Sequence, residues 1–238
     1  MLTFFRKIRR SLIDSGSARR YILYAIGEIL LVMIGILLAL QVNNWNEWRK
    51  DRKQEKILLQ DLVKNLEINI QTLRDDIDFL NRMDHSSKVI IDALNNRIGF
   101  TDSLKIHFHQ AWVPKQDLFL SNVGYQALKD EGISILTNKA LSDEILDLFE
   151  VTIPKILSTN SMTNKGSDSF NNHVVQNFTF KEGLGQTPND YESLFDDKFY
   201  ISWIKAYQDG RIYLIKTDNR LIDECNRVLQ LIKKELEE

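Results

Sequence analysis

The feature that most constrains this chain is an apolar run near its N-terminus, from Tyr21 to Val42, in which the clearly polar side chains are Glu28 and Gln41. As a helix with a rise of about 1.5 Å per residue, the run is about 33 Å long, enough to cross a hydrocarbon core of about 30 Å. The alternatives are a buried helix of a soluble protein and a cleaved signal peptide. The run is longer than the usual signal-peptide core and lacks a small-x-small cleavage site, so we expect an uncleaved membrane anchor.

Both flanks of the run favour a membrane boundary. Aromatic side chains, which prefer the headgroup region, stand at its ends; they are Tyr21, Tyr24, Trp45 and Trp48. Residues 1–20 contain one acid, Asp14, and six basic residues that we expect to contact anionic headgroups; these are Arg6, Lys7, Arg9, Arg10, Arg19 and Arg20. A nucleic-acid-binding arm is the competing interpretation, but the net charge of the whole chain is only −2.

The orientation is less well determined by sequence, because several basic residues also follow the run within 49–56. The positive-inside rule compares the numbers of basic residues on the two sides of the span, and here these numbers are nearly equal. We expect the short basic N-terminus to be cytoplasmic and residues 43–238 to be periplasmic, with the anchor in a bacterial inner membrane.

Glu28 lies well inside the apolar run. An ionised side chain near the bilayer centre costs on the order of 2.5–3.5 kcal/mol, and protonation or a partner lowers that cost. Its helical face is rich in small residues, which allow helices to approach closely. The expected transmembrane interface is Ala25, Glu28, Val32, Gly35 and Ala39. We therefore expect Glu28 to face another helix, from a second copy or another membrane protein; a neutral acid with local contacts in a monomer is the alternative.

The run AIGEILLVMIGILLALQVNNWNEW, with FFRKIR before it, resembles a large family of Gram-negative bacterial single-pass membrane proteins to which no function has been assigned. The shared features are a basic N-terminus, Gly27–Glu28 near the start of the span, and ALQVNNWNE at residues 39–47. Tyr125–Glu150 is similar, more loosely, to the middle of that family. The resemblance implies architecture and location and implies no reaction.

We expect a mainly α fold: one transmembrane helix that continues into a long helix, then a helical-bundle-like soluble domain. The expected divisions are a basic arm (1–20), the span (21–42), a helical stalk and hairpin (43–97) and the helical domain (98–238). The stalk carries an apolar seam typical of a coiled coil or of a core helix; its residues are Leu59, Leu62, Leu66, Ile70, Leu73, Ile77 and Leu80.

Further elements follow from local patterns. A break around Asp84–Ser86 should precede a helix at Ser87–Arg97, and Leu104–Pro114 should be extended. The remaining expectations are a helix at Tyr125–Asp130 stopped by Gly132, a helix capped by Asn138 that ends near Pro154, a loop or solvated helix at Ser158–Ser169, a loop at Lys181–Asp190, and a last helix at Asp209–Leu236.

Candidate chemistry is sparse. His107 and His109 form a His-x-His pair without a nearby third ligand, so we expect no metal. Gly183 and Gly185 lack the strand–turn–helix context of a dinucleotide site, and the single cysteine, Cys225, reads as a core residue.

No motif of a known catalytic site is present, so we expect no enzyme and no cofactor. The first hypothesis is a membrane-anchored helical interaction or sensing protein that self-associates through its span. The alternative is an accessory subunit of an ion-driven membrane complex, in which Glu28 binds protons. The expected partners are the lipid bilayer and a second copy or another membrane protein, and no nucleic acid.

Overall fold

The structure is a computed structural model that describes residues 18–112, 115, 117–163, 167–181 and 185–237. Of the basic arm, the side chain of Arg19 is described, and it is exposed; the other five basic side chains lie outside the described residues. The fold is mainly α, as the sequence predicts. The chain divides into two units, residues 1–55 and 56–238.

Helix α2 (Ala18–Asn95) contains the whole apolar run and continues without interruption to residue 95. The break expected around Asp84–Ser86, and with it the separate helix and the hairpin, is therefore wrong. Short polar residues are often unfavourable in the interior of a helix, because their side chains compete for the backbone hydrogen bonds. Here tertiary partners hold them: Asp84 accepts from Gln208, and Ser87 donates to the Ala111 carbonyl.

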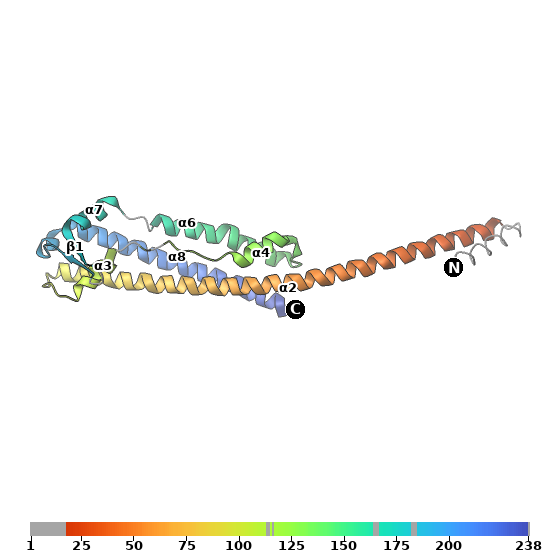
Figure 1. Ribbon diagram of the computed structural model, residues 1–238, viewed down its shortest axis with the longest axis horizontal. Helices are drawn as coiled ribbons and strands as arrows, with labels where there is room; N and C mark the ends of the chain where they lie inside the picture. The colour runs from red at the N-terminus through yellow and green to blue at the C-terminus, as the bar shows by residue number, and fades with distance from the viewer. Residues whose placement is uncertain (1–17, 113–114, 116, 164–166, 182–184, 238) are drawn as a thin grey trace. The chain divides into compact units, whose positions relative to one another are not determined.

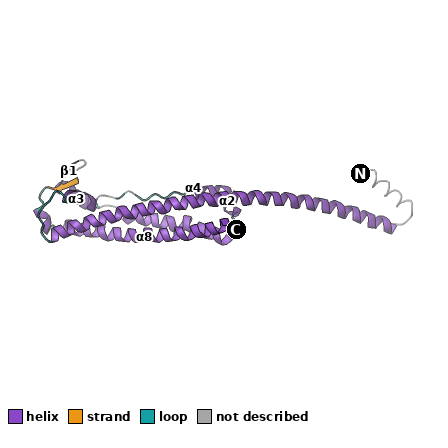
Figure 2. Cartoon of the chain, turned by 90° about the horizontal axis from the view of Figure 1, so that it is seen from below, coloured by secondary structure: helices purple, strands orange, loops and turns teal. Residues whose placement is uncertain are grey.

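The second unit is helical with one small sheet (Figure 1). Its longer helices are α3 (Leu104–Trp112), α4 (Val123–Glu131), α5 (Lys139–Leu146), α6 (Ile153–Thr163), α7 (Asp168–Asn177) and α8 (Lys198–Glu237). Shorter pieces are the 3-10 helices η1 (Ile133–Ile135) and η3 (Glu192–Asp196) and the π-helix η2 (Asp147–Thr152). Strands β1 (Phe178–Lys181) and β2 (Gly185–Pro188) pair antiparallel. Figures 1 and 2 both show α8 beside the later part of α2.

Local sequence signals located several of these elements. Helix α4 stops at Gly132, whose φ of 104° is the left-handed conformation that glycine tolerates. The Asn138 side chain accepts a hydrogen bond from the Leu141 amide at 3.1 Å, so Asn138 caps α5 as predicted. The stalk's apolar seam packs inside the second unit, where Leu62, for example, is fully buried. The seam is thus a core face within the chain.

Other expectations are wrong, because tertiary contacts override local patterns. The segment 104–112 is helix α3 and not extended, with Phe108 buried in an aromatic core. The helix expected to end near Pro154 continues through η2 into α6; the wider turns of a π-helix stand just before the residue that lacks an N–H. Part of the expected loop at 181–190 is strand β2. Helix α8 begins at Lys198, earlier than expected.

Two apolar cores lie in the second unit, and a layer of polar residues separates them along α2 and α8. On α2, the first core ends at Leu73 and the second begins at Ile90. On α8, the second core ends at Ile204 and the first resumes at Leu221. Of the buried charged residues that are described in the two helices, Asp84, Arg211 and Asp218 fall in these two intervals, and Glu55 lies before the first core. Buried charge needs partners, so the layer is where specific contacts are to be sought.

Candidate functional site

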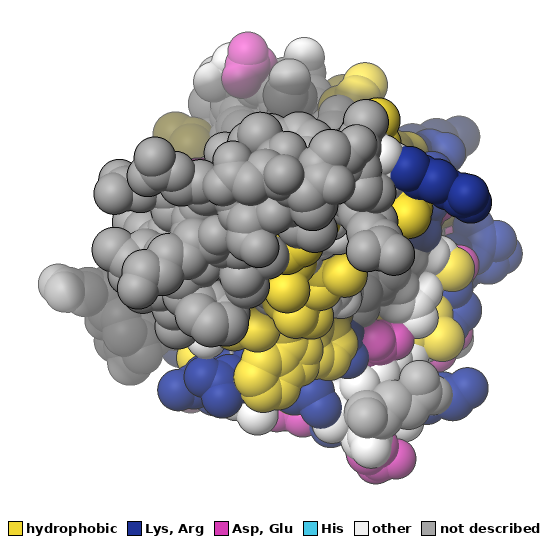
Figure 3. Space-filling view, turned by 90° about the vertical axis from the view of Figure 1, so that its right-hand side faces the viewer, with side chains coloured by type: hydrophobic (Ala, Val, Ile, Leu, Met, Phe, Trp, Pro, Cys, Tyr) yellow, Lys and Arg dark blue, Asp and Glu magenta, His cyan; other side chains and the backbone are white. Residues whose placement is uncertain are grey.

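The apolar segment of α2, residues 22–42, leaves its hydrophobic side chains exposed in the unit to which it belongs. Leu31 is 67% exposed and Val42 is 65% exposed. None of the most apolar window of this helix is buried by described residues. Figure 3 shows hydrophobic side chains gathered on the face that it draws. By length and composition, the apolar segment could cross a membrane.

The residues of the expected transmembrane interface all lie in α2. Side chains three and four positions apart on a helix share a face, so the backbone places the set along one side; the set is Ala25, Glu28, Val32, Gly35 and Ala39. A Cβ built at Gly35 would meet no atom within 4 Å. The chain therefore accommodates a larger side chain there, and the role of this face as a helix–helix contact stays a prediction.

Of the four expected boundary residues, Trp45 and Trp48 are 60% and 56% exposed. Tyr24 is half-buried, and the side chain of Tyr21 lies outside the described residues. The exposed indole rings are available to an interface between water and lipid, and their anchoring role stays a prediction.

In the polar layer, four side chains from four segments meet in what we name the acid–lysine cluster. Lys115 Nζ lies 2.8 Å from Asp76 Oδ2 and donates to Asn160 Oδ1 at 2.6 Å. Asn160 Nδ2 donates to Asp218 Oδ1 at 3.3 Å. The carboxyl of Asp76 lies close enough to Asp218 for its charge to raise the pKa of Asp218. The cluster therefore closes on itself and joins α2, the segment before α4, α6 and α8.

The acid–lysine cluster is withdrawn from water. Asp218 is fully buried, and the side chain of Lys115 is 4% exposed. Burial raises the pKa of Asp218 to about 7, helped by the neighbouring carboxyl of Asp76, while Lys115 and Asn160 act in the opposite direction. Burial and the neighbouring acid thus favour the protonated form of Asp218, compared with an exposed aspartate.

A second set of buried polar contacts surrounds Arg211 of α8, in the same layer. Its guanidinium donates to the Met83 carbonyl at 3.2 Å and to Ser87 Oγ at 2.6 Å. It also donates to the Ala111 carbonyl, at the end of α3. Burial lowers the pKa of Arg211 to about 10, and Asp84 opposes this. Arg211 stays charged at neutral pH and ties α8 to both α2 and α3.

The two histidines do not form a metal site. Because α3 is a helix, residues two apart point to different sides. His107 Nδ1 lies 3.0 Å from Ser86 Oγ, whereas His109 Nδ1 lies 3.2 Å from Gln186 Nε2. Burial and then the charge of His85 lower the pKa of His107. The described residues contain no group of three or more His, Cys, Asp or Glu side chains placed to hold a metal ion.

Cys225 is fully buried in the first core, as expected. Burial, and to a lesser degree the charge of Glu224, raises the pKa of its thiol. A protonated buried thiol is a poor nucleophile, so Cys225 acts as a packing residue.

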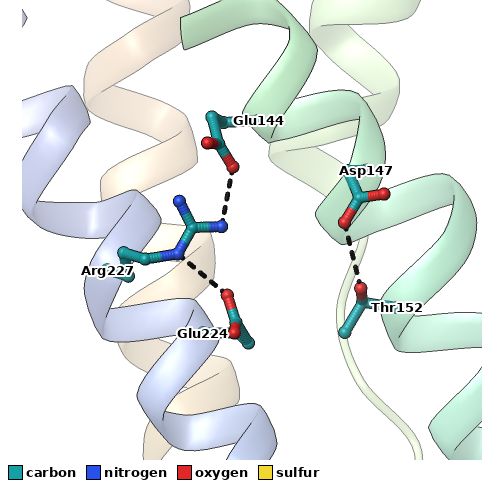
Figure 4. A network of polar contacts seen from close by, with 5 residues as sticks. All are labelled: Glu144, Asp147, Thr152, Glu224 and Arg227. Carbon is teal, nitrogen blue, oxygen red and sulfur yellow. Dashed lines mark hydrogen bonds and ion pairs between the residues drawn. The ribbon is translucent and has the colours of Figure 1, made fainter.

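A more exposed polar network joins α5 to α8 (Figure 4). Arg227 donates through Nη2 to Glu144 at 2.6 Å and through Nε to Glu224 at 2.9 Å. Beside it, within η2, Thr152 Oγ1 donates to Asp147 Oδ2 at 3.3 Å. The three residues of the ion-pair network are partly exposed, so the network contributes little to stability compared with the acid–lysine cluster.

The acid–lysine cluster and Arg211 were missed by sequence reasoning, although α8 carried a signal. Asp218 is four residues after Leu214 and three before Leu221, so it lies on the buried stripe of the helix. Arg211 lies on the same stripe, three residues before Leu214. Charged residues at positions where a helix should be apolar indicate a buried polar contact. Lys115 lies outside any helix, and its sequence gave no such signal.

Comparison with known proteins yields one finding. Residues 28–110 match a family of unknown function, DUF6090. The matched residues begin at Glu28, include the NNWNE motif after the apolar run, and end in α3. They cover less than half of the chain, and Tyr125–Glu150 lies outside them. Neither the curated proteins nor the solved structures give a match. The match supports an uncharacterised domain and brings no catalytic activity with it.

Proposed function

We propose that this chain is a single-pass membrane protein whose helical domain acts by binding or sensing and not by catalysis. The observation that carries the proposal is the exposure of the apolar segment of α2, which no described residue covers. Transfer of one exposed Leu or Ile side chain out of water is favourable by about 1.5–3 kcal/mol. A lipid bilayer removes the apolar side chains from water on every side of the helix.

Replacing Ile34 tests the anchor. Ile34 is 55% exposed in the apolar segment, so Ile34→Arg does not disturb the helical domain but opposes insertion by about 2.5–3.5 kcal/mol. The wild type and the matched control Ile34→Leu should sediment with membranes and resist alkaline extraction, whereas Ile34→Arg should be extracted or degraded. A wild-type protein that alkaline washing releases from membranes would refute the proposal.

For the orientation, we propose a cytoplasmic N-terminus and a periplasmic helical domain in a bacterial inner membrane. The single native thiol, Cys225, is buried and gives a low labelling background. Arg220 is exposed on α8, so Arg220→Cys provides a reporter. A membrane-impermeant maleimide should label this variant in spheroplasts and not in inside-out vesicles; the reverse pattern would place the domain in the cytoplasm.

We further propose that the span self-associates through its small-residue face. A Cβ at Gly35 or at Gly27 would meet nothing within 4 Å, so neither side chain clashes inside the protomer. Gly35→Leu should therefore reduce cross-linking between copies in mild detergent because it holds helices apart. Gly27→Leu, which lies outside the interface face, is the matched control. Equal cross-linking in the two variants would exclude this face as the contact.

The alternative function, an accessory subunit of an ion-driven complex, rests on Glu28, the acidic residue of the apolar segment. Glu28→Gln keeps the size of the side chain but does not exchange a proton. Under the alternative, the cellular function of the protein should be lost while copurification with a multi-span partner persists. Under the principal proposal, self-association and cellular function should both largely survive the substitution.

A further inference from the structure

We propose that Asp76 and Asp218 hold one shared proton inside the helical domain, and that release of this proton loosens the attachment of Lys115 and α6 to α2 and α8. The inference goes beyond the proposed function, because proton binding by the second unit does not depend on where the apolar segment resides. It assigns a proton-binding site to the acid–lysine cluster.

The first argument is an unsatisfied oxygen. Asp218 Oδ2 is fully buried and receives no hydrogen bond from any described residue. Asp76 Oδ2 also lacks a well-aligned hydrogen bond, although Lys115 Nζ lies 2.8 Å away. Two ionised carboxylates only accept hydrogen bonds, so neither can donate a hydrogen bond to the other. A single proton makes one of them a donor and supplies the hydrogen bond that the pair needs.

The second argument is charge balance. Among the described residues, the groups that act on Asp218 are Asp76 from α2, Lys115 from the segment before α4, and Asn160 from α6. With both acids ionised, two negative charges would share one lysine and one neutral amide in a buried site. With one proton bound, the Asp76–Lys115 ion pair is balanced and Asp218 is neutral. Uncompensated buried charge is strongly unfavourable, so the closed cluster favours the singly protonated form.

The direction of the pKa agrees with this geometry. Burial is the main cause that raises the pKa of Asp218 from 3.8 to about 7, and the charge of Asp76 acts in the same sense. In an opened state, where Asp218 meets water, its pKa returns toward the ordinary value. The closed state therefore binds the proton more tightly. Its advantage over the opened state falls as pH rises through this interval and is constant above it.

The opening should involve α6 and the Lys115 segment first. Asn160 is the α6 side chain that contacts both Lys115 and Asp218. When Asp218 ionises, Lys115 has two carboxylates to balance, and the arrangement with Asn160 is no longer favoured. Below about pH 7, the equilibrium constant for opening should rise by up to about tenfold for each pH unit, and it should then level off.

Two measurements on the full-length protein in nanodiscs test the proposal. Difference infrared spectroscopy should show the band of a protonated carboxylic acid at about pH 6 that is lost at about pH 9. Hydrogen exchange of the α6 amides, corrected for the intrinsic rate at each pH, should show the predicted rise in opening. Asp218→Asn should remove both signals, because the amide imitates the protonated acid. Asp223→Asn, an exposed acid on the same helix, should leave both unchanged.

Asp76→Asn provides a second variant if Asp218→Asn does not fold. Without the negative charge of Asp76, Asp218 pairs with Lys115 and should ionise at lower pH, so the band should be absent at about pH 6. A wild type without the band, or the same pH dependence in wild type and Asp218→Asn, would overturn the proposal. A band that persists in both variants would assign the proton to another group and would overturn it as well.

Discussion

Replacement of Lys115 by methionine should destabilise the helical domain far more than its position outside any helix suggests. Methionine retains most of the aliphatic volume but removes the ammonium group. The side chains of Lys115 and Asp76 are 4% and 13% exposed, and their charged atoms lie 2.8 Å apart. Breaking a buried ion pair by removing one partner typically costs about 3–5 kcal/mol. The lost hydrogen bond to Asn160 belongs to the same cost and is not added to it.

The measurement is urea denaturation of the full-length protein in a non-ionic detergent. Unfolding is followed by far-ultraviolet circular dichroism and by tryptophan fluorescence. Coincidence of the two transitions shows that unfolding is two-state. The matched control is Lys64→Met. Lys64 pairs with Asp61 at 2.9 Å, but their side chains are 70% and 46% exposed. This surface pair should contribute at most about 1 kcal/mol.

The pH dependence gives an independent check on the same variant. Without Lys115, Asp218 becomes neutral more readily, because Lys115 is the cation that favours its ionised form. The difference between wild type and Lys115→Met should therefore shrink as the pH falls toward about 4, where an aspartate is ordinarily half protonated. If Lys115→Met is no more destabilising than Lys64→Met at neutral pH, Lys115 does not serve as a buried counter-ion.

Three further predictions concern the helical domain. The wild type should lose stability relative to Asp218→Asn as pH rises from about 4 to about 7, since the raised pKa of Asp218 favours the folded state only while the carboxyl is protonated; denaturation over a pH series measures this. Gly124→Ala should destabilise by about 1–3 kcal/mol in thermal unfolding, because its Cβ would lie 2.9 Å from the backbone oxygen of Asp61. Asn138→Ala should cost about 1 kcal/mol in the same assay, because the amide of Leu141 loses its cap.

Features set by local periodicity could be predicted from the sequence. The apolar run, the buried seam of α2 and the Asn138 cap each depend on residues within one or two helical turns of each other. The same applies to the mainly α fold. Such signals do not show which helices pack against each other. The predicted start of α8, Asp209, is therefore too late in the sequence, although Tyr200 and Ile204 continue the buried face of the helix.

The acid–lysine cluster could not be assembled from sequence, because its members come from four separate segments. Asp76 and Asp218 are brought together by the packing of α2 against α8, and Lys115 comes from a segment without periodicity. The prediction of a break near Asp84 is wrong for the same reason. The polar residues of this segment indicate the end of a helix unless their partner in α8 is known. Buried charge on an apolar stripe is the one sequence signal that pointed to this layer.

The π-helix η2 fixes the rotational phase of everything that follows it in α6. A π-turn accommodates an additional residue relative to the α-helix, and each residue of an α-helix advances the side chains by about 100°. Removal of a single residue from Asp147–Thr152 would thus convert the π-turn to an α-turn and leave Asn160 directed at Asp218, whereas removal of a residue between Ile153 and Asn160 would rotate Asn160 by about 100°. The π-turn therefore absorbs one residue of chain length without changing the direction in which the Asn160 amide faces.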